Sequence, residues 1–199
     1  MALQQDDQRP GPGAALPCGR AALRKAPGCV KHIVLVLLVL LAAGCGVRRE
    51  PVDRGEVWRA IQPLAARYRL DPAFIYALVA AESSFDARAR NGEARGLLQL
   101  KPVSWATVST RPYEPAVWDW QTNLETGIDY LAWCRHALHA RGKFSERLLL
   151  AAFHYGFDYV AACDFDENRI PRPGHPLYRE LWRGNLHPVS PPVEIPAGR

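Results

Sequence analysis

The chain has 199 residues, five cysteines and a formal net charge of +5 at pH 7. Five of its 25 basic and two of its 20 acidic residues precede residue 46, so residues 46–199 carry only +2, a charge that gives no support to nucleic-acid binding. A segment of this size buries enough apolar surface to fold alone, and we expect a monomer with one folded domain.

Residues 1–29 are rich in Pro, Gly and Arg and show no apolar periodicity. They would make an unusually long start for an export signal, whereas Val30-Lys31-His32, just before an apolar run, would make an ordinary one. We therefore interpret residues 1–29 as a gene-model extension, which lies upstream of a true translation start at Val30. A genuine but disordered leader is the alternative.

An export signal follows in residues 30–44. Ile33 to Ala43 form an unbroken apolar run of eleven residues, which is too short to span a bilayer but has the length of a signal-peptide core. Leu41-Ala42-Ala43-Gly44-Cys45 resembles a bacterial lipobox, so we expect a lipid on Cys45, a tether over 45–52 and a periplasmic, membrane-anchored protein. Gly46 after the cysteine favours the outer membrane. A plain secretory signal is the alternative.

The remaining cysteines agree with export. Cys18 and Cys29 fall in the doubtful leader, which leaves Cys134 and Cys163 in the folded part. In an oxidising compartment they could pair, or remain free with Cys134 buried, and the sequence leaves both possibilities open. No CxxC pattern or metal-ligand spacing occurs, so we expect neither a metal nor another cofactor.

The first half of the folded part has the apolar spacing of two helices. Glu56 to Tyr68 carries apolar residues on one face. Asp71 before Pro72 is a typical helix start, and the second helix is expected to end near Ser83. Asn91-Gly92 then marks a turn.

The second half also reads as helical. The expected elements are a helix from Pro102, a loop from Ser109 to Trp120, a helix from Asn123 to His139, a helix capped by Ser145, and a short helix from Leu177 to Trp182. Residues 188–199 are rich in proline and are expected to be disordered. No strand pair is convincing, so the predicted class is all-α.

Glu82 is the strongest candidate for chemistry. It follows the apolar residues Leu78 to Ala81, so its side chain is expected at the end of a helix whose body is buried. A carboxyl held against apolar packing is disfavoured in its charged form and can protonate a poor leaving group such as a glycosidic oxygen. Most single glutamates in helices are solvated, so the neighbouring motifs decide this case.

Four motifs follow one another along the chain: Tyr68 to Leu78, Glu82-Ser83-Ser84-Phe85 with Asp86, Ala94 to Leu100 (which contains Gly96-Leu97-Leu98-Gln99) with Pro102, and Asn123 to Leu131, which reads N-x-x-x-G-x-x-Y-L. Together they resemble the lytic transglycosylase domain of the lysozyme-like superfamily. The resemblance implies a compact lysozyme-like helical domain of the goose-type or SLT class over residues 53–187, with a cleft that binds the glycan strands of peptidoglycan.

The resemblance also implies a mechanism. Glu82 would protonate the oxygen that links N-acetylmuramic acid to N-acetylglucosamine, and would then act as base while the muramoyl C6 hydroxyl closes a 1,6-anhydro ring. One carboxylate suffices because the substrate supplies its own nucleophile. The Gly96-Leu97-Leu98 backbone and Gln99 would line the cleft beside Glu82.

Further substrate-binding candidates stand where the family pattern is altered. Phe153 occupies the place of a tyrosine, His154 that of an asparagine, and Tyr155 offers a hydroxyl only if the register shifts. Asn91 stands where a serine is frequent and can still bind an acetamido group. Tyr178 resembles the closing tyrosine of the family only loosely.

These departures leave two alternatives to a transglycosylase: a peptidoglycan-binding lipoprotein with impaired catalysis, and a hydrolytic lysozyme that takes a base from elsewhere. Three aromatic residues, Tyr76, Trp105 and Trp133, could stack on sugars, although their helical spacing favours the core.

Overall fold

The computed structural model describes residues 49–193, so the predicted signal peptide, Cys45 and the last six residues lie outside the described part. This part contains eight α-helices and one 3-10 turn: α2 (Arg54–Tyr68), α3 (Pro72–Ser83), α4 (Pro102–Val108), α5 (Tyr113–Ala116), α6 (Trp120–Ala140), α7 (Glu146–Tyr155), α8 (Phe157–Ala162), η1 (Glu167–Arg169) and α9 (Pro176–Trp182). The predicted helical class is confirmed. Between residues 49 and 193 there is no helix with the length and apolar character needed to cross a membrane.

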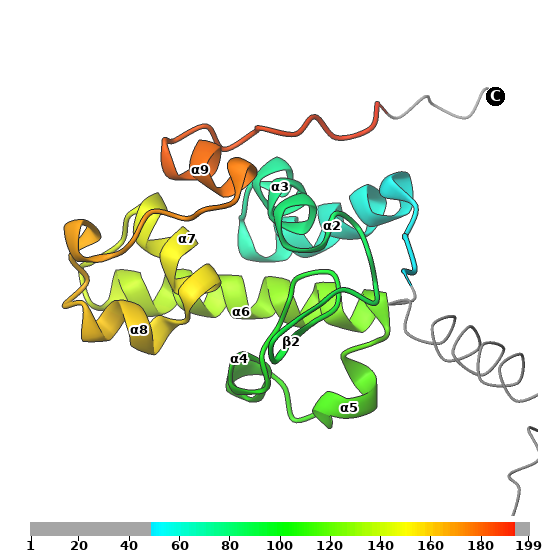
Figure 1. The fold of residues 1–199 in the computed structure, drawn as a ribbon, viewed down its shortest axis with the longest axis horizontal. Helices are drawn as coiled ribbons and strands as arrows, with labels where there is room; N and C mark the ends of the chain where they lie inside the picture. The colour runs from blue at the N-terminus through cyan, green and yellow to red at the C-terminus, as the bar shows by residue number, and fades with distance from the viewer. Residues whose placement is uncertain (1–48, 194–199) are drawn as a thin grey trace, which may run out of the picture. The chain divides into compact units, whose positions relative to one another are not determined.

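The long helix α6 organises the domain. It packs against α2, α4 and α7, and Figure 1 shows it running beneath α2 and α3, with α4 and α5 on its other side. Helix α3 is buried from Phe74 to Ala80, which explains why its apolar residues surround the helix instead of forming one stripe. The core therefore lies between α3 and α6.

Local capping fixes the helix starts as predicted. The Asp71 carboxylate accepts the N–H of Ala73 at 2.9 Å, and the Ser145 hydroxyl accepts the N–H of Leu148 at 3.0 Å. Helix α6 begins three residues earlier than expected because the Asp119 carboxylate caps it through the N–H of Thr122. The preceding segment is mostly loop, as expected, apart from the short α5.

Besides α5 and η1, the structure contains a hairpin and a helix that were not anticipated. A small antiparallel hairpin pairs β1 (Arg90–Asn91) with β2 (Ala94–Arg95) around Gly92, which has a φ of 56°. The expectation of no strand pair is therefore wrong, because two-residue strands are too short to show alternation. The second addition is α8, which begins directly after Gly156 (φ 104°) ends α7.

The hairpin leads into a loop that is fastened to α6 by Asn123. The Asn123 side chain is buried, accepts the N–H of Leu98 at 2.9 Å, and donates to the carbonyls of Arg95 at 3.0 Å and Val117 at 3.1 Å. A Cβ on Gly96 would lie 2.2 Å from the Asn123 amide nitrogen. Glycine is needed here so that the loop can approach α6 closely.

Residues 49–52, which the sequence assigned to the tether, pack against the domain and are called the N-terminal strap below. The strap runs antiparallel to the segment after α3: the N–H of Val52 donates to Phe85 O, and the N–H of Ala87 donates to Glu50 O, both at 2.9 Å. The folded domain therefore begins before residue 53.

Both cysteines of the described part are free thiols. Cys134 is buried in α6, and this burial raises the pKa of its thiol to about 12. Cys163 is half-buried at the end of α8.

Candidate active site

Glu82 is the penultimate residue of α3, at a sharp turn of the chain. Ser84 and Phe85 follow with φ angles of 54° and 68°, and the N–H of Ser84 closes the helix on Ala80 O at 3.1 Å. The Ser83 hydroxyl donates to Val79 O and accepts the N–H of Phe85 at 3.1 Å. This turn is thus held by its own hydrogen bonds and directs Glu82 out of the helix, with 13% of its side chain exposed.

Two side chains from later helices meet the Glu82 carboxylate. The Tyr178 hydroxyl of α9 donates a hydrogen bond to Glu82 Oε1, and His154 Nδ1 of α7 lies 3.6 Å from the same oxygen. Burial, and then the Glu82 charge, raise the pKa of Tyr178 well above its usual 10. Tyr178 therefore remains a hydrogen-bond donor at any physiological pH, and Glu82 Oε2 has no hydrogen-bond partner among residues 49–193.

His154 also holds this arrangement through its ring. Its imidazole packs against the Tyr178 ring at a centroid distance of 4.2 Å and against the Tyr155 ring at 4.6 Å. Its side chain is only 29% exposed. The distance of 3.6 Å to Glu82 exceeds that of a good hydrogen bond, so His154 contributes mainly by packing against Tyr178.

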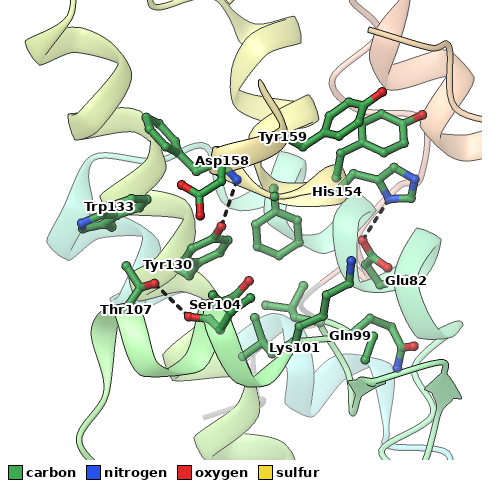
Figure 2. A pocket seen from close by; sticks show the side chains of 18 of the residues that line it. Glu82, Gln99, Lys101, Ser104, Thr107, Tyr130, Trp133, His154, Asp158 and Tyr159 are labelled. Atoms are coloured by element: carbon green, nitrogen blue, oxygen red, sulfur yellow. Dashed lines mark hydrogen bonds and ion pairs between the residues drawn. The ribbon is translucent and has the colours of Figure 1, made fainter. Parts of the chain in front are cut away.

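A cavity of about 270 Å³ opens on one side of Glu82. Figure 2 shows Glu82 and His154 at one end of it and Trp133 at the other, with Lys101 and Gln99 below. We call it the aromatic pocket, after the rings that line it: Tyr130, Trp133, Phe153, Tyr155, Phe157 and Tyr159. Trp133 stacks on Tyr130 at 5.8 Å and is half-buried, so part of its ring faces the cavity.

A second, wider cavity of about 760 Å³ opens on the other side of Glu82. We call it the charged pocket, because ionisable residues line it. They come from the strap, the segment after α3, the hairpin and the α9 region: Arg49, Asp86, Arg90, His175 and Tyr178. The two pockets share Glu82, Asn91, Gln99 and His154. They form one cleft that passes over the Glu82 carboxylate.

Most of the predicted site residues lie in this cleft, namely Glu82, Asn91, Leu98, Gln99, Phe153, His154, Tyr155 and Tyr178. Gly96 and Leu97 line neither pocket. Leu97 is fully buried in the core, and Gly96 approaches Asn123 instead of a ligand. The Gln99 amide is held by Ala89 O and Gly96 O, both at 2.9 Å, which fixes its side chain at the cleft.

The hydroxyl that contacts Glu82 comes from Tyr178 and not from position 153 or 155, where the family pattern led us to expect one. The Phe153 ring is buried against Tyr130 at a centroid distance of 6.1 Å, and the Tyr155 hydroxyl donates to Pro171 O at 3.0 Å. Tyr178 and Glu82 are 96 residues apart in the chain, so no local pattern shows their contact.

Sequence reasoning missed other lining residues. Arg49 was assigned to the tether, Tyr130 belonged to the fourth motif but was given no place in the cleft, and Arg90 gave no signal. Of the three aromatic residues left between core and cleft, Tyr76 and Trp105 are buried in the core, and Trp133 alone of the three lines the aromatic pocket. Within the described residues, no group of three or more His, Cys, Asp or Glu side chains is arranged to hold a metal ion.

A comparison of the sequence with protein families identifies the family of this domain. The family described as "Transglycosylase SLT domain" matches residues 59–163, more than half of the chain. The matched span includes Glu82, the Gly96–Gln99 loop and His154, whereas Arg49 and Tyr178 lie outside it. The chain therefore belongs to the SLT-type lytic transglycosylases of the lysozyme-like superfamily.

Proposed function

We propose that this protein cleaves the β-1,4 bond between N-acetylmuramic acid and N-acetylglucosamine in peptidoglycan and leaves a 1,6-anhydromuramoyl end. One observation carries the proposal: the Glu82 carboxyl lies where the two pockets join, with Oε1 bound by Tyr178 and Oε2 without a hydrogen-bond partner among the described residues. A glycan strand bound across both pockets would place a glycosidic oxygen against this free carboxyl oxygen.

In the first step Glu82 acts as a general acid. The proton that it transfers would be carried by Oε2, because the Tyr178 hydroxyl already donates to Oε1. The proton passes to the glycosidic oxygen as the bond from that oxygen to the muramoyl C1 breaks, and N-acetylglucosamine leaves with a free hydroxyl.

In the second step the Glu82 carboxylate acts as a base. It takes the proton of the muramoyl C6 hydroxyl while the C6 oxygen bonds to C1, which closes the anhydro ring and returns the proton to Glu82. No water is consumed, and a well-oriented intramolecular attack has an effective molarity of about 10⁵ M or more. Between the steps the Tyr178 hydroxyl stabilises the carboxylate through its hydrogen bond.

We further propose where the enzyme works. A lipid on Cys45 would anchor a monomer in the periplasm, at the outer membrane, where peptidoglycan strands are accessible. This assignment is supported by the lipobox-like Leu41–Cys45 segment.

The direct test is mass spectrometry of peptidoglycan digested by the full chain and by Glu82→Gln. The variant keeps the shape of the side chain but has no proton to transfer, so we expect a loss of at least about 10³-fold in anhydro products with unchanged folding. Glu93→Gln, at an exposed carboxylate outside both pockets, is the matched control and should retain activity.

The products also separate the alternatives. Reducing muramoyl ends would indicate a hydrolytic lysozyme. An absence of products, together with retained sedimentation on sacculi, would indicate a binding lipoprotein. Full activity of Glu82→Gln would refute the mechanism.

A further inference from the structure

We propose that the charged pocket binds carboxylate groups carried by the muramoyl residues of the strand, through Arg49 of the N-terminal strap and Arg90 of the hairpin. The inference rests on the proposed function, because it requires a glycan strand to lie across Glu82. It assigns to residues 49–52 a role in recognising the substrate. These residues precede the span that the family match covers.

The strap is built into the domain by its backbone and by two carboxylates. The N–H of Glu50 donates to Asp86 Oδ1 at 2.8 Å, and the Arg88 guanidinium binds the Glu50 carboxylate at 2.7 Å. With the backbone bonds of the strap to Phe85 and Ala87, these contacts fix Glu50 and Val52, directly after Arg49. Arg49 therefore lies at the wall of the charged pocket on a fastened segment.

One oxygen of each carboxylate in this pocket already accepts a hydrogen bond. Asp86 Oδ1 accepts the N–H of Glu50 and, at 2.9 Å, that of Arg88, and it faces the strap. Glu82 is bound by Tyr178. Among the described residues, Arg49 and Arg90 form no salt bridge, although both line the cavity. The pocket thus offers two guanidinium groups without an anionic partner.

Arg90 is nevertheless held in place. The central carbon of its guanidinium lies 4.5 Å from the centre of the Trp118 ring, a cation–π contact, and its N–H groups form no hydrogen bond with the residues that the structure describes. Free N–H groups of this kind form paired hydrogen bonds with a carboxylate. Two such groups at one cavity match an anionic substituent better than a neutral sugar.

Peptidoglycan offers this chemistry in two forms. The muramoyl lactyl group ends in a carboxylate when the peptide is absent, and the peptide stem carries several carboxylates when it is present. Both place an anion on the residue next to the cleaved bond, and the experiment below distinguishes them.

The test measures sedimentation of the full chain with sacculi, in the Glu82→Gln background so that the polymer is not degraded. The double variant Arg49→Ala/Arg90→Ala should bind intact sacculi about tenfold more weakly at low salt. Arg59→Ala/Arg172→Ala removes the same charge at two exposed arginines outside the cleft and is the matched control. Circular dichroism confirms that each variant is folded.

A comparison of intact sacculi with amidase-stripped sacculi shows which carboxylate the site binds. A deficit on intact sacculi that disappears on amidase-stripped sacculi assigns the site to the peptide stem. A deficit that appears only on stripped sacculi assigns it to the lactyl carboxylate, which is amidated in the intact polymer, and a deficit on both shows that the site binds either carboxylate. Equal binding by the double variant and the control overturns the proposal, because only net charge would then matter. The result is independent of the product analysis, which tests Glu82 alone.

Discussion

The two pockets that meet at Glu82 differ in chemistry and in origin. Every residue lining the aromatic pocket falls within the span matched by the family, and its walls are rings from α6, α7 and α8. The charged pocket takes Arg49, His175 and Tyr178 from segments outside that span. Rings bind the apolar faces of sugars whatever their substituents, whereas charges respond to the substituents. The difference therefore suggests that sugar binding and substituent recognition lie on opposite sides of the cleaved bond.

The strongest test of the comparison concerns Tyr178, the residue of the charged side that touches the Glu82 carboxyl, the proposed acid. Tyr178→Phe removes the hydrogen-bond donor from Glu82 Oε1, so the carboxylate formed during the reaction loses its stabilising partner. We expect kcat to fall about 100-fold with little change in KM. Activity assays with a soluble glycan strand measure both constants.

The control variant removes a tyrosine–carboxylate hydrogen bond of the same kind at another place in the domain. The Tyr68 hydroxyl donates to the Asp129 carboxylate at 2.6 Å, away from the cleft. Tyr68→Phe should retain kcat. An equal loss in both variants would show that the effect comes from folding and not from the site.

A smaller effect is expected on the aromatic side. Trp133→Ala removes the half-buried ring at the far end of the aromatic pocket, and we expect KM to rise about tenfold because a stacking surface is lost. This rise should be the same at low and high salt. The loss caused by the Arg49 and Arg90 substitutions should shrink as salt screens the charges. A salt-dependent Trp133→Ala effect would contradict the division of the cleft.

The last prediction concerns the free energy of unfolding of the domain at high pH and leaves activity at neutral pH unchanged. Burial raises the pKa of Tyr130, one of the rings that line the aromatic pocket, to about 12, and burial also raises the pKa values of Cys134 and Tyr178. Because these pKa values are raised in the folded state, the unfolded chain loses its protons first. Stability is fully present below about pH 9 and falls as the pH rises toward 12.

Urea unfolding at several pH values measures this decline, which we expect to total a few kcal/mol. Cys134→Ala should remove its earliest part, and Tyr130→Phe should flatten the decline between pH 10 and 12. A wild-type stability that stays constant to pH 12 would contradict the burial of these groups.

The sequence predicted the features that short stretches of chain determine. Asp71 and Ser145 cap their helices because a side chain reaches a backbone N–H only two or three residues away. Apolar spacing also located most of the helices. Helix α8 escaped notice because it has six residues and follows Gly156 without a side-chain cap.

The site was harder to predict because it depends on contacts between distant segments. Glu82 stood out through its motif, but its hydrogen bond with Tyr178 arises from the packing of α9 against α3. Gly96 was expected to approach the substrate, yet the same property, a missing Cβ, serves the contact with Asn123. The glycine at position 96 indicated that another group approaches the backbone closely, but the sequence could not show whether that group is a sugar or a side chain of the protein.

If Cys45 carries the proposed lipid, the position of the strap limits how far the protein can reach. Arg49 lies in the wall of the cleft, and only four peptide units separate it from Cys45. A fully extended chain spans at most about 3.5 Å per residue, so this connection covers roughly 14 Å. With a lipid on Cys45, as proposed, one rim of the cleft would stay within that distance of the lipid headgroups. The enzyme would then cut only the layer of wall nearest its own membrane, and its working radius would be set by the thickness of the gap between membrane and wall.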